Sequence, residues 1–212
     1  MARSPGPLWL FNFPPVLGVF VPDNLHKVGV LELLPAPHFG AVFGGDGGYV
    51  DNPADPGGAT NFGISLRFLK SQGLDIGDID GDGDIDADDI RALTKKDAAA
   101  IMKREFWDSM GLDDLGKPLC AMVLYDAAVN MGAGYARKMA QKALGVTADG
   151  IWGQVTKAAL RVCDDKKTAV AMCHIRRARY HELVRKNPDL SVFLKGWLRR
   201  VDSLEGLIER AR

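Results

Sequence analysis

The 212-residue sequence has few cysteines, no net charge and no long apolar run, and each shortage argues against a class of protein. Its three cysteines lack the spacing of a zinc site or a disulfide framework, so we expect folding in a reducing compartment. The 27 Lys and Arg residues balance the 27 Asp and Glu residues, which argues against charge-driven nucleic-acid binding. Neither DNA nor RNA is therefore an expected partner.

Residues 1–45 differ from the rest, with only four charged side chains and many of the chain's prolines. Their most apolar stretch, residues 7–21, is too short to cross a bilayer, and Pro14 and Pro15 interrupt any helix through it. A basic start and an apolar run resemble a secretory signal, but no small-residue cleavage site follows. We expect an N-terminal extension of uncertain structure and no stable membrane insertion.

From residue 60 onward the pattern is typical of an all-α protein, without the alternation of a strand. We expect a helix over residues 60–73 that Thr60 caps and Gly73 ends. Residues 94–97 resemble a capping box, and Pro118 is placed to open an apolar helix at the centre of the fold. Further helices are expected near 135–144, 153–162 and 165–186, with a last one capped by Asp189.

The expected core and its surroundings follow from the apolar helix near residues 119–131. Its members are predicted to be Leu124, Ala128, Met131 and Leu144. The arginines of the last two helices are expected to be solvated: Arg176, Arg177, Arg179, Arg199 and Arg200.

The segment from residue 78 to 89, DIDGDGDIDADD, matches the twelve-residue loop of an EF-hand. Aspartates fill the ligand positions, and Gly83 stands where the loop turns sharply. The predicted calcium ligands are Asp78, Asp80, Asp82, Asp84 and Asp89, with Asp86 at the position that often binds through water. The alternative is a solvated acidic loop. Since no full helix precedes the loop, we expect a structural calcium site and not a calcium sensor.

Residues 46–65, DGGYVDNPADPGGATNFGIS, form a loop rich in turn-forming and polar residues. The segment is either a simple connector or a functional site built on a rigid scaffold. It resembles the signature of glycoside hydrolase family 108, the bacterial and prophage N-acetylmuramidases. Residues 124–146, 148–160 and 176–201 resemble, in order, the family's central helices, its peptidoglycan-binding motif and its closing segment. The resemblance covers residues 46–204.

This resemblance implies a lysozyme-like helical fold that cleaves the β-1,4 bond between N-acetylmuramic acid and N-acetylglucosamine in peptidoglycan. The family's catalytic residue is the Glu of Glu-Gly-Gly-Tyr, but here the position is Asp46. Asp55 and Thr60 are candidate partners, since glycoside hydrolysis generally uses two carboxyl groups. Both have other interpretations: Asp55 as a turn residue and Thr60 as a helix cap. Predicted substrate contacts are Tyr49, Asn61 and Asn130.

We therefore divide the chain into an extension (1–45), a muramidase-like segment (46–119) and a helical core with the peptidoglycan-binding-like region (120–212). We expect a monomeric endolysin that stays in the bacterial cytoplasm until it reaches the cell wall. Three alternatives remain open. They are a weakened peptidoglycan-binding descendant, a calcium-stabilised protein-interaction module, and a lytic transglycosylase, which would leave an anhydro-sugar product.

Overall fold

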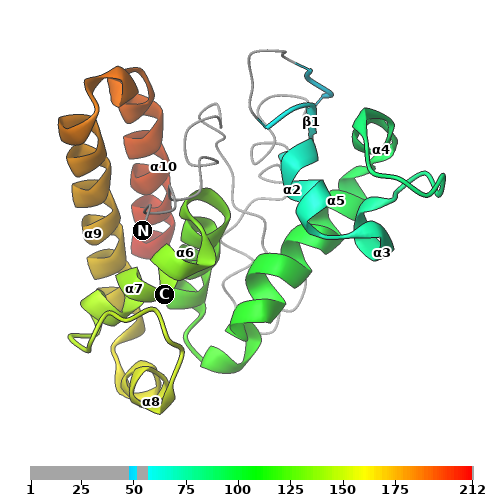
Figure 1. Ribbon diagram of the computed structural model, residues 1–212. Coiled ribbons are helices and arrows are strands. Elements are labelled where there is room, and N and C mark those ends of the chain that lie inside the picture. The colour runs from blue at the N-terminus through cyan, green and yellow to red at the C-terminus, as the bar shows by residue number, and fades with distance from the viewer. Residues whose placement is uncertain (1–47, 52–56, 212) are drawn as a thin grey trace, which may run out of the picture.

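The computed structural model describes residues 48–51 and 57–211, which form a largely helical protein with one small hairpin (Figure 1). The hairpin consists of β1 (Thr60–Asn61) and β2 (Ile64–Ser65). The helices before the centre are α2 (Leu66–Ser71), α3 (Leu74–Gly77), α4 (Ala87–Ala92) and α5 (Lys95–Met102). The rest of the chain contains α6 (Pro118–Met131), α7 (Ala133–Ala143), α8 (Gln154–Val162), α9 (Asp165–Lys186) and α10 (Ser191–Arg210).

The hairpin corrects the predicted helix over residues 60–73. Thr60 pairs with Ser65, and Asn61 pairs with Ile64, so Phe62 and Gly63 form a two-residue turn. Both have positive φ, 48° and 78°, as a tight hairpin turn requires. The helix begins only at Leu66, where the Ser65 hydroxyl accepts from the backbone N–H of Phe68 at 3.3 Å. Thr60 is therefore a strand residue and not a helix cap.

The predicted capping box at residues 94–97 is confirmed. The Thr94 hydroxyl accepts from the Asp97 N–H at 3.2 Å, and the Asp97 carboxylate accepts from the Thr94 N–H at 3.0 Å. After α5 the chain continues through a π-helical turn, η5 (Lys103–Trp107), and two 3₁₀ turns, η6 (Asp108–Met110) and η7 (Leu112–Leu115). This connection leads to Pro118, which opens α6 as predicted.

Helix α6 lies at the centre of a large core and packs against α7 and α9, while α9 packs along α10 (Figure 1). Leu124, Ala128 and Met131 are buried as predicted, but Leu144 is only partly buried at the end of α7. Asp189 does not cap α10. It lies in a 3₁₀ turn, η8 (Pro188–Leu190), and α10 begins without a side-chain cap.

Two of the arginines predicted to be solvated are buried. Arg176 is fully buried, and only 8% of Arg200 is exposed. Both bind the buried Asp126 of α6: Arg200 Nε lies 2.6 Å and Arg176 Nη1 lies 3.2 Å from its Oδ2. Burial by itself would raise the pKa of Asp126, but the two guanidinium groups hold it below its ordinary value. This ion cluster ties α6 to α9 and α10.

No helix among the described residues combines the length and the apolar character that a membrane span needs.

Candidate active site

Within the signature segment, residues 46–65, the backbone near its start pairs with the hairpin at its end. Val50 and Thr60 exchange two hydrogen bonds, with N–O distances of 2.7 and 2.8 Å. The bridge brings Tyr49, which lies eleven residues before Thr60 in sequence, against the small core beneath the hairpin. The Thr60 hydroxyl is half-buried and lies 3.4 Å from the carbonyl oxygen of Gly58, to which it donates.

Tyr49 is held from two sides. Its hydroxyl donates to Asp51 Oδ2 at 3.2 Å, and the guanidinium of Arg91 lies 4.7 Å from the centre of its ring. Arg91 belongs to α4, the helix that follows the aspartate loop. The ring of Tyr49 is half-buried and keeps part of its surface available for contact.

Asn61 joins the hairpin to the same helix. Its side chain is buried, and Nδ2 donates to the Ile90 carbonyl at 2.9 Å. Its Oδ1 has no hydrogen-bond partner among the described residues. The Nδ2 group therefore holds β1 against α4. A contact between Asn61 and a substrate would come in addition to this hydrogen bond.

The side chain of Asn130, near the end of α6, is likewise held by hydrogen bonds within the protein. Its Nδ2 donates to the Asp126 carbonyl at 2.7 Å and lies 3.1 Å from Asp126 Oδ2. The polar residue on this apolar helix therefore has its partner one turn earlier, at the edge of the buried ion cluster. Asp46 and Asp55 lie outside the described residues.

A cavity of about 350 Å³ lies beneath the hairpin. Gly63 and Ser65 line it from the hairpin, while Phe68 and Phe106 stack with their ring centres 5.7 Å apart. Val129 closes it from α6. This cavity was not predicted from the sequence, where Phe68 and Phe106 were the available signal. Its walls are mostly apolar, as those of small-molecule binding sites usually are.

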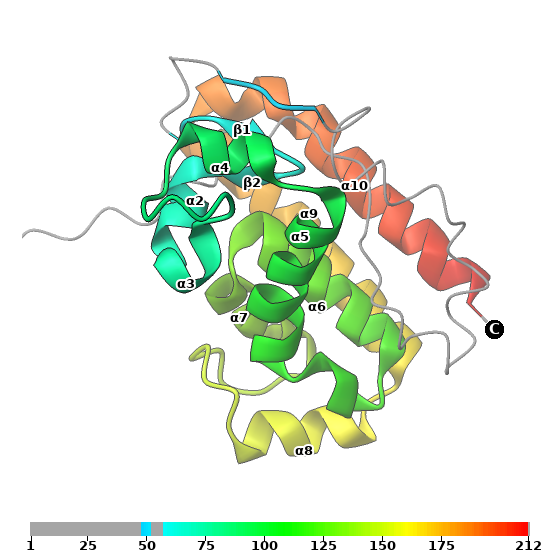
Figure 2. The ribbon, with the colours of Figure 1, turned by 90° about the vertical axis from the view of Figure 1, so that its right-hand side faces the viewer.

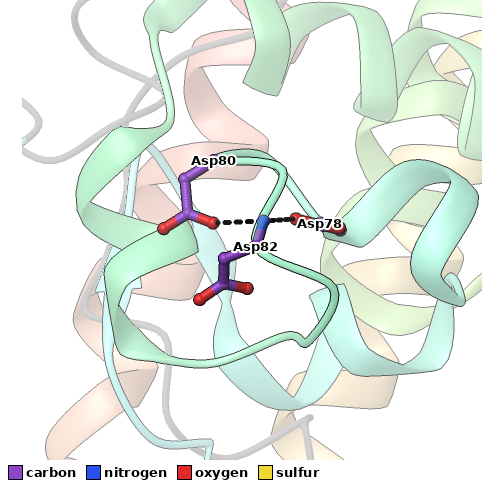
Figure 3. Close-up of side chains that lie close together, drawn as sticks. All are labelled: Asp78, Asp80 and Asp82. Carbon is purple, nitrogen blue, oxygen red and sulfur yellow. Dashed lines mark hydrogen bonds between the residues drawn. The ribbon is translucent and has the colours of Figure 1, made fainter.

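The aspartate loop lies between α3 and α4, and its first half is folded around Asp78 (Figure 3). Asp78 Oδ1 accepts from the N–H groups of Gly81 and Asp82 at 2.7 and 3.1 Å. Asp78 Oδ2 accepts from Gly83 at 3.0 Å. Carboxylate oxygens of Asp78, Asp80 and Asp82 lie within 4.8 Å of one another. The loop thus gathers three of the predicted calcium ligands.

The second half of the loop forms another carboxylate group, from Asp84, Asp86 and Asp89. Asp89 is buried, and its two oxygens accept from the N–H groups of Ile79 and Asp86, each at 2.6 Å. These hydrogen bonds hold its pKa below the ordinary value even though burial acts in the opposite direction. Asp89 therefore ties the start of the loop to its end.

The charges of the loop repel one another. Desolvation and the neighbouring Asp82 raise the pKa of Asp80, while Asp82 and desolvation raise the pKa of Asp84. A hard divalent cation prefers several carboxylate oxygens of this kind. The residues present fit calcium, because the donor set is all oxygen and Gly83, at φ 97°, permits the turn of the loop.

A second motif, residues 149–156, is organised by the buried side chain of Gln141. Its Nε2 donates to Asp149 Oδ1 at 2.7 Å and to the Ile151 carbonyl at 2.9 Å, and its Oε1 accepts from Gly150 at 2.8 Å. Thr156, also buried, lies 3.1 Å from Nε2. The motif residues Asp149, Gly150 and Thr156 therefore shape the loop that leads into α8.

Comparisons with known proteins agree with this architecture. Residues 39–132 match the family described as Glycosyl hydrolase 108, and residues 135–202 match the family described as Predicted Peptidoglycan domain. The solved structure of SagA from Brucella abortus is similar, with 32% identity and a TM-score of 0.65 over 86% of this chain and 95% of that one. No match was found among curated proteins.

The helical fold and its signature loop define a lysozyme-like glycoside hydrolase that acts on peptidoglycan. More particularly, the chain belongs to the glycosyl hydrolase 108 family of N-acetylmuramidases and carries a peptidoglycan-binding region. The first family match includes α6, and the second begins within α7, so the two meet at the turn around Gly132.

Proposed function

We propose that the chain cleaves the bond after N-acetylmuramic acid with Asp46 as its general acid, in the position where the family signature has Glu. The observation that carries this proposal is the Val50–Thr60 bridge, because it joins the segment that directly follows Asp46 in sequence to the hairpin that carries Thr60. Two elements of the family signature thus meet at one place.

The other residues of the site receive supporting roles in this proposal. Asp55 is the candidate second carboxylate, which activates water or attacks the sugar. The Thr60 hydroxyl orients that water, and Tyr49 offers its partly exposed ring to a sugar. Asn61 and Asn130 hold the hairpin and the end of α6 in place through the Ile90 and Asp126 carbonyls.

The test is a set of substitutions at position 46, assayed by the release of reducing sugar ends from purified peptidoglycan. Asp has one methylene less than Glu, which moves the carboxyl by about 1 Å, and such a misplacement costs up to about a hundredfold in rate. We expect weak activity from the natural chain, a rate about tenfold higher or more for Asp46→Glu, and none for Asp46→Ala. Asp189→Glu, a change of the same kind at an exposed position far along the sequence, is the control.

Full activity in Asp46→Ala would contradict the assignment and direct the search to Asp51, Asp55 and Glu105. If Asp46→Glu remains as inactive as the natural chain, the chain is a peptidoglycan-binding descendant of a hydrolase. Mass spectrometry separates hydrolysis from transglycosylation, because only the latter leaves anhydro-sugar ends.

We also propose that calcium binds the aspartate loop and acts through structure alone. The ion would be held by the carboxylates of Asp78, Asp80, Asp82 and Asp89. Asp84 would contribute its backbone carbonyl, as the residue at the same position of an EF-hand loop does. Two contacts connect this loop to the site: Arg91 on the Tyr49 ring and Asn61 on Ile90. Calcium would therefore order the helix on which the signature segment rests. In this proposal the protein is a monomer that remains in the bacterial cytoplasm until it reaches the wall.

A further inference from the structure

A second hollow, of about 500 Å³, lies between α8 and the connection formed by η6 and η7. We call it the α8 groove. Its walls include Asp114 and Leu115 on one side, Lys157 and Arg161 on the other, and Trp152 from the loop that Gln141 organises. Figure 2 shows α8 below the end of the chain segment that joins α5 to α6. The groove shares no lining residue with the cavity beneath the hairpin.

Hydrogen bonds fix the two walls of the groove to each other. Lys117 Nζ donates to the Cys163 carbonyl at 2.6 Å. The Asp165 carboxylate accepts from the N–H groups of Leu119 and Cys120 at 3.0 and 2.9 Å. The groove is thus formed before any ligand arrives, which lowers the ordering cost of binding.

Three charged side chains that line the α8 groove are unpaired. Lys157 and Arg161 lie one turn apart on α8 and are exposed, and their side chains make no hydrogen bond or ion pair with any residue that the structure describes. The carboxylate of Asp114, on the facing wall, has no such partner within the same residues. By contrast, Asp108 at the groove's edge is held by Lys103 at 2.5 Å. Two unpaired cations therefore face one unpaired anion across the groove, and Trp152 forms part of its lining.

We propose that the α8 groove binds the stem peptide of peptidoglycan. This inference rests on the proposed function, since it concerns the same polymer. In the glycan strand the lactyl carboxyl is amidated by the peptide, so the charges are on the stem: free carboxylates and, where it is not cross-linked, a free amine. Lys157 and Arg161 pair with the carboxylates, Asp114 pairs with the amine, and Trp152 packs against the alanyl methyl groups.

The test measures binding of a purified disaccharide-peptide to the full chain by calorimetry, beside the same disaccharide without its peptide. In this disaccharide N-acetylglucosamine precedes N-acetylmuramic acid, so the bond after N-acetylmuramic acid, which a muramidase cleaves, is absent. Binding is therefore measured without turnover. Losing two charge-assisted contacts should weaken peptide binding by about tenfold or more in the Lys157→Gln, Arg161→Gln double variant. Binding of the natural chain should also weaken as salt concentration rises.

The chain contains a matched control. Lys195 and Arg199 on α10 repeat the same residue types at the same spacing and are exposed, and their side chains have no hydrogen bond or ion pair within the described residues. The Lys195→Gln, Arg199→Gln variant should bind the disaccharide-peptide as the natural chain does. Asp114→Asn should reduce affinity for the peptide with a free amine and leave affinity for an N-acetylated peptide unchanged.

Equal weakening by the groove variant and the control would overturn the proposal, as would equal binding of the disaccharide with and without its peptide. The proposed hydrolase function fails independently. If the natural chain releases no reducing ends from peptidoglycan, but the stem peptide still binds through Lys157 and Arg161, the groove assignment stands without the catalytic one. If peptidoglycan is cleaved but the stem peptide does not bind, the catalytic assignment stands and the groove assignment fails.

Discussion

The two cores of this protein are stabilised in different ways. The hairpin lobe, residues 57–102, buries eight apolar residues, and its buried polar groups, Asn61 and Asp89, bind backbone atoms. The helical lobe, residues 107–211, has a core cluster of twenty-five buried apolar residues around a buried ion cluster. The larger core pairs its buried carboxylate with two guanidinium groups, whereas the smaller one holds Asp89 through backbone N–H groups and depends on caps and, in our proposal, a metal ion.

The difference has a functional consequence. The described part of the signature segment and the aspartate loop both pack against the smaller core, so Tyr49 and Thr60 depend on its less extensive packing. The α8 groove, in contrast, is built on the helical lobe and on hydrogen bonds between backbone groups and the half-buried side chains of Lys117 and Asp165. We expect cleavage to respond to conditions that loosen the hairpin lobe, and stem-peptide binding to persist under them.

The largest expected effect is on the buried ion cluster. Asp126→Asn removes the charge that compensates Arg176 and Arg200, and breaking one partner of a buried pair costs about 3–5 kcal/mol. Urea denaturation measures the loss. Asp202→Asn is the control, because its ion pair with Arg177 is exposed and such pairs contribute about 0–1 kcal/mol. Equal losses in the two variants would mean that the cluster does not set the stability of the helical lobe.

Removal of calcium should have the next largest effect, confined to the hairpin lobe. A ligand at about 100 times its dissociation constant adds about 2.7 kcal/mol, so a chelator should lower the melting temperature by several degrees. Hydrogen exchange should increase in α2, α4 and the hairpin but not in α9 or α10. Unchanged exchange around the loop after chelation would contradict the calcium proposal.

The smallest expected effect is the loss of a helix cap. Thr94→Ala removes the hydroxyl that accepts from the Asp97 N–H at 3.2 Å, and replacing such a cap costs about 1 kcal/mol. Thr147→Ala, in the loop before the 149–156 motif and exposed, is a control without a side-chain hydrogen bond among the described residues. If the cap affects cleavage more than global unfolding, the rate of peptidoglycan hydrolysis should decrease under conditions in which the protein is still folded.

Local patterns in the sequence determined much of this molecule. Pro118 and Thr94 mark helix starts because their effects involve only neighbouring residues, and the spacing of aspartates at residues 78–89 fixes the form of the loop in the same way. The order of motifs likewise indicated the family, as the matches over residues 39–132 and 135–202 bear out.

Tertiary structure alone decided the features that depend on distant partners. Thr60 is in a strand because Val50 and Ser65 pair with it, which outweighs its suitability as a helix cap. Arg176 and Arg200 are buried because Asp126, 50 and 74 residues away, offers them a carboxylate inside the core. The charged Asp126 in an otherwise apolar helix was the available signal, but a sequence does not state which cations reach it. The α8 groove likewise exists only where two segments distant in sequence face each other.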